Sequence, residues 1–268
     1  TYGITPEGNL IEIDDEELIR IARDFGVAPL MLISTLTEEG TFSNELAHTI
    51  LNDQDIQNNL IENVIRNLRE KQYYGLDIDF EYVLPEDREN FVNFVRNMTE
   101  RLNQEGFTVL TALAPKVSAD QPGLLYEAHD YPALGEVSNR VLLMTYEWGY
   151  TYGPAMAVAP VNRVREVLDY AVSEIPRDKI YMGIPNYGYN FILPYIQDVS
   201  RAASVSNVEA VQIAADVGSP IRYNEEAQSP YFIYFDNQGR EHQVWFEDAR
   251  SIEAKLDLFT EYDFIGVG

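Results

Sequence analysis

The sequence predicts an α/β protein folded as a (β/α)8 TIM barrel, with a small α+β subdomain inserted into it. Short apolar runs that fit buried strands alternate with segments whose apolar residues recur at helical spacing. Repetition of strand, helix and strand indicates a parallel sheet with crossover helices. The chain has 268 residues and several such units, which favours a closed barrel over an open sheet.

Apolar runs mark the expected barrel strands, and helical patterns fill the segments between them. Strands are expected at residues 29–34, 75–81, 108–114, 141–146, 180–185 and 264–267. Helices are expected over residues 56–68, after Pro85, after Pro160 and over residues 249–259. Thr1 to Ile4 reads as the end of a strand already under way, so we expect a further barrel element before Thr1.

The alternation of strands and helices is lost from Gly188 to about Asp248. Within this stretch, residues 231–235 and 243–246 flank a turn at residues 236–239 and read as an antiparallel hairpin. We therefore expect one barrel over residues 1–268, interrupted at about 188–248 by the inserted subdomain.

Composition limits the partners of this chain. A formal net charge of −25 argues against nucleic acid or an anionic membrane surface as the main partner. The absence of cysteine excludes disulfides and thiolate sites, and no apolar run is long enough to span a bilayer. His48, His129 and His242 are scattered without metal-ligand spacing, and each is interpreted as a surface or hydrogen-bonded residue. We expect a monomer without metal or cofactor.

Three carboxylates, Asp77, Asp79 and Glu81, alternate with apolar residues in the segment from Gly75. Side chains of a strand point alternately to opposite faces, so the three acids share one face. They could form the solvated face of an amphipathic strand. If the strand belongs to a parallel barrel, the acids point inward instead, and mutual repulsion together with burial prepares one of them to carry a proton near neutral pH.

The acidic segment and the next motif resemble those of glycoside hydrolase family 18, the chitinase-like (β/α)8 barrels. Residues 75–81 are similar to the family's D-x-x-D-x-D-x-E signature, although Tyr74 stands where its first Asp is expected. Residues 144–147 resemble the M-x-Y-D motif, with Glu147 in place of Asp. The tryptophan that the family carries on its last strand would lie beyond Gly268.

Further similarities follow in the family's order. Residues 183–188 resemble G-x-P-x-Y-G, and Ser251 and Lys255 resemble the S-x-x-x-K that precedes the last strand. The runs at 112–116 and 244–251 are similar to the spore-germination branch, whose members lyse cortical fragments. The resemblance covers nearly the whole chain, and several motifs in order are far more specific than one acidic alternation.

The resemblance implies roles for the acidic residues. Glu81 would be the general acid that protonates the glycosidic oxygen, and Asp79 would orient the 2-acetamido group of the substrate. Asp77 would share a proton with Asp79, and Tyr146 would hydrogen-bond the acetamido oxygen. The acetamido oxygen itself would attack the anomeric carbon, so no enzyme carboxylate would serve as nucleophile.

The resemblance also implies residues that bind the sugar. Those expected are Glu147, Trp148, Asn186, Tyr187, Met144 and Tyr2. Each has a structural alternative: the tyrosines and Met144 could be packing residues, and Asn186 could cap a turn. Trp245, in the predicted hairpin, fits a sugar platform or the core equally well. The implied location is extracytoplasmic, in the spore coat or cortex or secreted.

Three other functions remain open at this point. A chitinase would use the same catalytic residues with different subsites. A glycan-binding lectin on the same barrel would usually lack the signature Glu, which is present here as Glu81. A metal enzyme could use the acidic row as oxygen ligands for Mg²⁺ or Ca²⁺.

Overall fold

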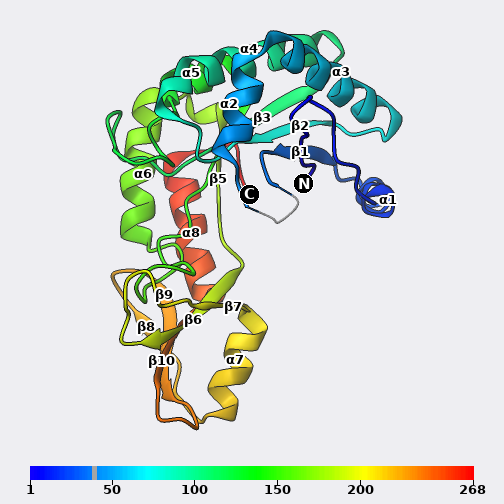
Figure 1. Cartoon of the computed structure of the whole chain (residues 1–268). Coiled ribbons are helices and arrows are strands. Elements are labelled where there is room, and N and C mark those ends of the chain that lie inside the picture. Colours follow the sequence, from blue (N-terminus) through cyan, green and yellow to red (C-terminus); the bar gives the residue numbers. More distant parts are fainter. Residues whose placement is uncertain (38–40) are drawn as a thin grey trace. The chain divides into compact units, whose positions relative to one another are not determined.

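Parallel strands form the sheet of unit 1, the first of the two compact units into which the chain divides, made of residues 1–143 and 171–181. In chain order, which is also their order in the sheet, the strands are β1 (Leu30–Ser34), β2 (Gly75–Asp79), β3 (Thr108–Leu113), β4 (Arg140–Leu143) and β5 (Ile180–Met182), and the short β11 (Gly266–Val267) is hydrogen-bonded to β5 as the sixth. Tyr2 adds a parallel bridge to Ile33 of β1. This computed structural model describes residues 1–37 and 41–268 (Figure 1).

Helices cover the strands of unit 1. They are α1 (Glu16–Asp24), α2 (Asn44–Asn52), α3 (Gln54–Glu70), α4 (Arg88–Gln104) and α5 (Tyr131–Val137), with short 3-10 turns at Pro85–Asp87 and Arg177–Lys179. Helices α3 and α4 run along one side of β1 to β3 (Figure 1). Phe80, just after β2, stacks on Phe91 and Phe94 of α4 with ring centres 6.0 and 5.4 Å apart. Burying each such ring stabilises the fold by about 1.5–3 kcal/mol, which fixes the end of β2 against α4.

Unit 2, made of residues 144–170 and 182–268, is built around an antiparallel sheet. The sheet contains β6 (Tyr187–Leu193), β7 (Ala203–Ser206), β8 (Arg222–Asn224), β9 (Ser229–Phe235) and β10 (Glu241–Trp245) in the order β7-β6-β10-β9-β8. The helices are α6 (Val161–Glu174), whose last turn belongs to unit 1, α7 (Asn207–Asp216) and α8 (Ala249–Tyr262), and β11 (Gly266–Val267) follows α8. Gly188 is required in β6, because a Cβ there would lie 2.2 Å from the carbonyl oxygen of Trp245.

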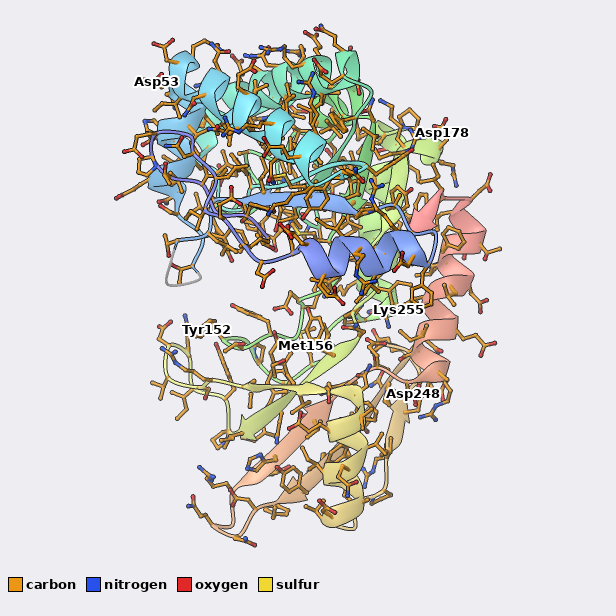
Figure 2. The ribbon with its side chains drawn as sticks, turned by 90° about the vertical axis from the view of Figure 1, so that its right-hand side faces the viewer. Asp53, Tyr152, Met156, Asp178, Asp248 and Lys255 are labelled. Atoms are coloured by element: carbon orange, nitrogen blue, oxygen red, sulfur yellow. The ribbon has the colours of Figure 1, made fainter. Side chains whose placement is uncertain are left out.

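A buried ion pair ties β10 to α8. Asp248 caps α8 by accepting hydrogen bonds from the amides of Arg250 and Ser251. Lys255 lies further along α8 (Figure 2), and its Nζ donates to Glu247 Oε2 at 2.8 Å. Both side chains are almost completely buried, at 1% and 0% exposure. Burial raises the pKa of Glu247 and lowers that of Lys255, so each charge depends on the other for compensation.

Most elements agree with the sequence-based prediction, and the differences concern their ends. The predicted hairpin is confirmed as β9 and β10, and α3, α4, α6 and α8 lie where helical patterns were found. Several predicted strands end earlier than expected: β2 ends at Asp79, β4 at Leu143 and β5 at Met182. The chain turns directly after β4, where the amide of Tyr146 donates to the carbonyl of Met144 at 2.9 Å.

Candidate active site

Asp77 and Asp79 lie on the same face of β2. In the parallel register Asp77 pairs with Leu32 and Leu110, and Asp79 pairs with Ser34. Leu76 and Ile78, on the opposite side of the strand, are fully buried. Asp77 is only 8% exposed, so the alternative of a solvated acidic face is wrong for this residue.

Burial makes the two aspartates hold protons more tightly than free aspartate does. Oδ1 of Asp77 and Oδ1 of Asp79 are buried, and neither has a hydrogen-bond partner among the described residues. Desolvation, with a smaller contribution from the charge of Asp79, raises the pKa of Asp77 to about 7. Desolvation raises the pKa of Asp79 to about 6. Burial therefore shifts the pKa of both aspartates toward neutral pH, with the charge of Asp79 adding to the shift of Asp77.

Glu81 stands beyond the carboxyl end of the strand rather than on it. Strand β2 ends at Asp79, the ring of Phe80 is anchored on α4, and the partly buried Glu81 follows. Tyr82 then adopts a left-handed conformation with φ 55°, which few non-glycine residues do. Backbone strain of this kind gathers at functional sites, where neighbouring packing enforces it. The C-terminal edge of a parallel sheet is also where barrel enzymes place catalytic groups.

Two buried polar residues lie in the segment between β3 and α5, and the sequence did not identify them as site residues. His129 is fully buried, and its Nδ1 accepts the amide proton of Ala114 at 3.1 Å. Burial, helped by the charge of Lys116, lowers the pKa of His129 to about 4, so the ring is neutral and its proton resides on Nε2. The ring also interacts with the backbone of Phe80, the residue before Glu81, although its buried Nε2 has no hydrogen-bond partner of good geometry among the described residues.

Lys116 is the second of these residues, and it is fully buried. Its Nζ donates to the carbonyls of Ala119 and His129, each at 3.0 Å. Ser34, opposite Asp79, also has a buried hydroxyl without a partner among the described residues. Among His129, Lys116 and Ser34, only Lys116 lay in a segment that the sequence related to the family, the run at 112–116.

Tyr2 does not offer a surface to a sugar, contrary to expectation. Its ring is 1% exposed. Its hydroxyl donates to Asp15 Oδ2 at 2.5 Å and accepts from Lys71 Nζ at 2.7 Å. Tyr73 donates to the same carboxylate. Tyr2 is therefore part of a buried polar cluster, and the expectation that it contacts a sugar is wrong.

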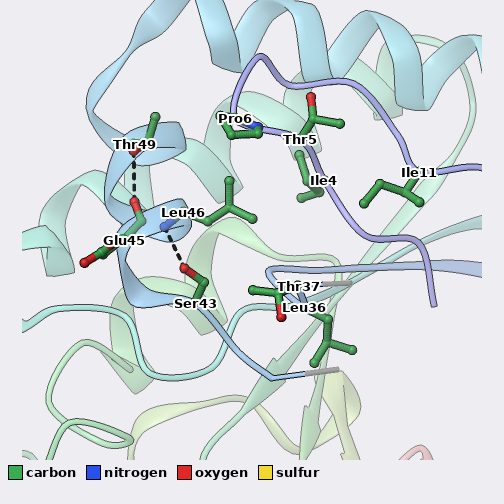
Figure 3. Close-up of a pocket in the computed structure, with 10 residues that line it drawn as sticks. All are labelled: Ile4, Thr5, Pro6, Ile11, Leu36, Thr37, Ser43, Glu45, Leu46 and Thr49. Carbon is green, nitrogen blue, oxygen red and sulfur yellow. Dashed lines mark hydrogen bonds between the residues drawn. The ribbon is translucent and has the colours of Figure 1, made fainter. Parts of the chain in front are cut away.

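An open pocket lies beyond the end of β1, within unit 1 (Figure 3). Its volume is about 460 Å³. It is lined by Ile4, Thr5, Pro6, Ile11, Leu36, Thr37, Ser43, Glu45, Leu46 and Thr49. Because β1 and β2 are parallel, Leu36 and Thr37 follow β1 at the same edge of the sheet at which Glu81 follows β2.

In unit 2 the two downstream motifs adjoin each other. Thr145 donates from Oγ1 to the carbonyl of Gly183 at 2.7 Å. Glu147 has a left-handed backbone with φ 68°, and its carboxylate accepts hydrogen bonds from the hydroxyls of Tyr187 and, at 3.0 Å, Tyr189. Desolvation, then Glu147, raises the pKa of both tyrosines, that of Tyr189 to about 12. Both phenols therefore remain donors, and they fix an otherwise exposed carboxylate in place.

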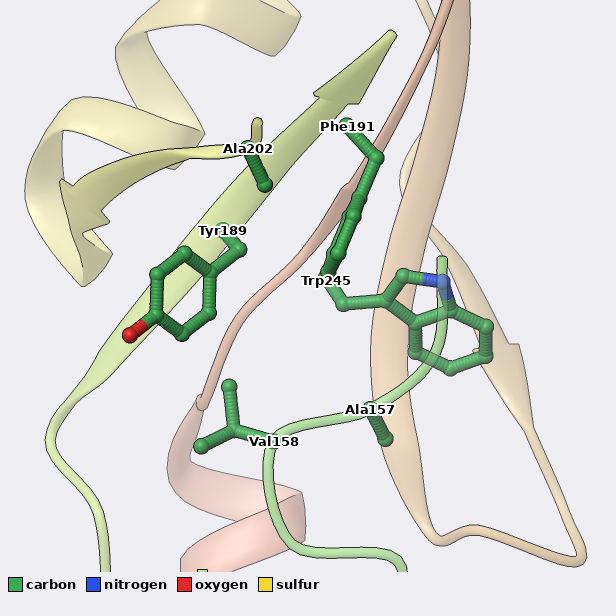
Figure 4. Close-up of a cluster of buried hydrophobic side chains, with 6 residues drawn as sticks. All are labelled: Ala157, Val158, Tyr189, Phe191, Ala202 and Trp245. Carbon is green, nitrogen blue, oxygen red and sulfur yellow. The ribbon is translucent and has the colours of Figure 1, made fainter. Parts of the chain in front are cut away.

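The other predicted binding residues of unit 2 differ in exposure. Met144 is buried at 8% exposure, Tyr146 and Trp148 are partly buried, and Asn186 is exposed. Trp245 is 7% exposed and stacks on Tyr231 at 4.7 Å. It belongs to a hydrophobic cluster with Ala157, Val158, Tyr189, Phe191 and Ala202 (Figure 4). For Trp245 the core interpretation is therefore the one the structure supports.

Across residues 1–37 and 41–268, no three His, Cys, Asp or Glu side chains are grouped so that they could hold a metal ion. In the same ranges no helix is both long and apolar enough to cross a membrane.

The parallel strands with their covering helices, and the buried acids at the carboxyl end of β2, define an α/β-barrel protein with a carboxylate site. The family described as "Glycosyl hydrolases family 18" matches residues 22–268, so the chain belongs to that family. The predicted barrel fold is thereby confirmed, as is the resemblance that its motifs indicated.

Several known proteins are similar to this chain. The cortical fragment-lytic enzyme of Bacillus subtilis (strain 168) is 45% identical over 238 residues, which are 89% of this chain and 55% of that protein. The crystal structure of the Bacillus cereus spore cortex-lytic enzyme SleL superposes with a TM-score of 0.95 at 41% identity, covering all of this chain and 61% of that one. A chitinase from Chromobacterium violaceum gives a TM-score of 0.91 at 25% identity, covering 99% of this chain and 83% of that one. The chain thus spans little more than half the length of its cortex-lytic relatives.

Proposed function

We propose that this chain is a retaining glycoside hydrolase that cleaves N-acetylglucosamine-containing glycans, namely peptidoglycan fragments of the spore cortex. The observation that carries the proposal is the buried pair Asp77 and Asp79, four and two residues before Glu81, in which burial raises the pKa of both carboxyls toward neutral pH. A carboxyl group at the end of such a row is suited to general acid catalysis.

The proposed reaction uses the substrate's own acetamido group. Glu81 donates its proton to the glycosidic oxygen as the bond to the anomeric carbon breaks. The acetamido oxygen forms a bond to that carbon and gives an oxazolinium ion, whose positive charge Asp79 stabilises while Asp77 shares its proton. Water then attacks the anomeric carbon, gives a proton back to Glu81 and restores the acetamido group with retained configuration. Family 18 is known as an exception to the two-carboxylate scheme, which supports this assignment.

Residues of unit 2 are proposed to bind the sugar. Tyr146 donates a hydrogen bond to the acetamido oxygen, and Glu147, held by Tyr187, accepts one from a sugar hydroxyl. Trp148 provides a stacking surface. Asn186 contributes a polar contact from its exposed position, and Met144 packs beneath the sugar.

The choice of cortex peptidoglycan is supported by the relatives named as cortical fragment-lytic enzymes at 40–45% identity. It implies action outside the cytoplasm, in the spore coat or cortex or after secretion. Chitin is the second candidate substrate, and the similarity to the Chromobacterium violaceum chitinase favours it.

The test compares the purified chain with its Glu81→Gln variant on cortex fragments and on chitin oligomers. Loss of the general acid should lower kcat by about 10²- to 10⁴-fold. Glu86→Gln, at an exposed carboxylate five residues further on, is the matched control and should keep wild-type activity. Mass spectrometry of the products identifies the cleaved bond, and NMR of the fresh product reports the anomeric configuration.

The outcomes separate the alternatives. Full activity of Glu81→Gln, or an inverted product, would refute the mechanism. Cleavage of chitin oligomers alone would assign the chain as a chitinase. Glycan binding without turnover by the wild type would indicate a lectin. A thiazoline mimic of the oxazolinium ion should inhibit, and lack of inhibition would count against the acetamido step.

A further inference from the structure

Two exposed tyrosines and an arginine lie together on one surface of unit 2. Tyr150 and Tyr152 are 38% and 53% exposed, and their rings meet edge to face with centres 6.2 Å apart. The guanidinium carbon of Arg201 lies 5.2 Å from the ring centre of Tyr152. Figure 2 locates Tyr152 on its loop. We call these three residues the Tyr152–Arg201 platform.

Hydrogen bonds hold the two loops of the platform together. The amide of Ala202, next to Arg201, donates to the carbonyl of Thr151 at 2.8 Å. Tyr195 donates from its hydroxyl to the carbonyl of Tyr152 at 3.0 Å. One bond joins two backbone groups and the other joins a side-chain hydroxyl to a backbone carbonyl, so the two loops are held together without the rings of Tyr150 and Tyr152.

The platform adjoins the carboxylate that we propose binds a sugar. Tyr150 and Tyr152 follow Glu147 by three and five residues on the same loop. The hydroxyl of Tyr189 binds Glu147 and also interacts with the side chain of Thr151, between the two tyrosines. A glycan held at Glu147 would continue toward the platform along this loop.

The charge of Arg201 is unusual for its surroundings. The chain has a net charge of −25, and most arginines of unit 2 pair with a carboxylate. Those pairs involve Arg163, Arg165, Arg240 and Arg250. Arg201 instead rests on Tyr152, and no carboxylate of the described residues forms an ion pair with it. A guanidinium stacked on an aromatic ring presents its N–H groups in the plane, a geometry that matches a carboxylate.

We propose that the Tyr152–Arg201 platform is a subsite for a carboxylate-bearing unit of the glycan, an inference that rests on the proposed function. The tyrosine rings contact the apolar face of a sugar ring, and Arg201 binds its carboxylate. A muramic residue carries a lactyl carboxylate where it has no peptide stem, and where a stem is attached through that carboxyl the carboxylates are those of the stem, whereas chitin carries none. The platform therefore selects peptidoglycan fragments over chitin.

The test measures binding by isothermal titration calorimetry, so that it does not depend on turnover. The ligands are a stem-free muramic-containing oligosaccharide, the same glycan with its lactyl carboxylate amidated, a stem-bearing fragment, and a chitin oligomer. Arg201→Gln should weaken binding of a free-carboxylate ligand about 10- to 100-fold and leave the amidated glycan and the chitin oligomer within about twofold. Arg222→Gln, at another exposed arginine, is the control and should change none of them.

The pattern of losses decides the source of the carboxylate. A loss with the stem-free glycan assigns the lactyl carboxylate, and a loss confined to the stem-bearing fragment assigns the stem. Arg201→Lys should restore only part of the affinity, because an ammonium lacks the planar fork. Equal affinity of wild type and Arg201→Gln for every ligand, or an equal loss on amidated and free ligands, would overturn the proposal. Failure of wild type to cleave any substrate would instead refute the proposed function.

Discussion

Replacing Asp77 by Asn should make the protein more stable, and the gain should grow with pH. Asp77 is 8% exposed, its Oδ1 has no partner among the described residues, and burial raises its pKa from 3.8 to about 7. At alkaline pH the folded protein must therefore bury the ionised carboxylate of Asp77, which costs free energy, whereas the same group ionises in water in the unfolded chain. Asparagine keeps the size of the side chain and removes the charge.

The magnitude follows from linkage. Because the folded pKa lies above the unfolded one, the contribution of Asp77 to stability is fully present below pH 4 and is lost as pH rises to about 7. Each pKa unit corresponds to about 1.4 kcal/mol, so the complete loss is about 4 kcal/mol. About 1.7 kcal/mol of it is already lost at pH 5. The advantage of Asp77→Asn should therefore increase by about 2–3 kcal/mol between pH 5 and pH 8.

The assay is urea unfolding of wild type and variant at both pH values, followed by circular dichroism. Asp14→Asn removes a charge from an exposed position of the same unit and should show no such pH dependence. A stability difference that is the same at pH 5 and pH 8, or a variant less stable than wild type at pH 8, would refute the reasoning.

Two further substitutions test the buried polar groups of each unit. His129→Phe keeps a ring against Phe91 but leaves the Ala114 amide unpaired, which should cost about 1–3 kcal/mol in urea unfolding. His129→Phe should also lower kcat more than it raises KM, and His129→Gln should recover part of the lost kcat. Unchanged kcat and KM in His129→Phe would show that the ring only fills space. Lys255→Met leaves the buried carboxylate of Glu247 without its ion-pair partner and should lower the free energy of unfolding by about 3–5 kcal/mol. The loss should be larger at pH 8 than at pH 5, because burial raises the pKa of that carboxyl. Glu247→Gln combined with Lys255→Met should recover most of the loss, and a double variant as unstable as the single one would contradict this account.

The strands of the barrel could be predicted because parallel strands buried on both faces are nearly continuous apolar runs. Several helices gave no comparable pattern. Helix α1 has only nine residues, fewer than the window over which helical periodicity is read, and it buries only Ile19 while Leu18 remains 69% exposed. Helix α7 buries only Ala210 and Ala214. Its capping box at Ser206 and Glu209 was the one signal that would have placed its start.

In the candidate site, features set by local geometry could be predicted from the sequence, whereas contacts set by the tertiary fold could not. The spacing of Asp77 and Asp79 determined that they share a face, because alternation in a strand is local geometry. The contacts of His129 could not be predicted, since they depend on how the segment after β3 folds back to bring the ring to the Ala114 amide and the Phe80 backbone. The burial of Tyr2 could not be predicted for a related reason: its hydrogen-bond partners Asp15 and Lys71 are distant in sequence, and only the fold brings the three side chains together.

Glutamate at position 147 is compatible with a binding role even though the family motif has aspartate there. Its backbone adopts φ 68°, and two tyrosine hydroxyls donate to Oε1, so the extra methylene is held in one geometry. A carboxylate accepts about four hydrogen bonds. Tyr189 also approaches Oε2, at 3.2 Å, which still leaves that oxygen able to accept a hydrogen bond from a ligand. Because Glu147 is exposed, a sugar hydroxyl can reach it without displacing either tyrosine, so the longer side chain still offers an acceptor oxygen for the proposed contact.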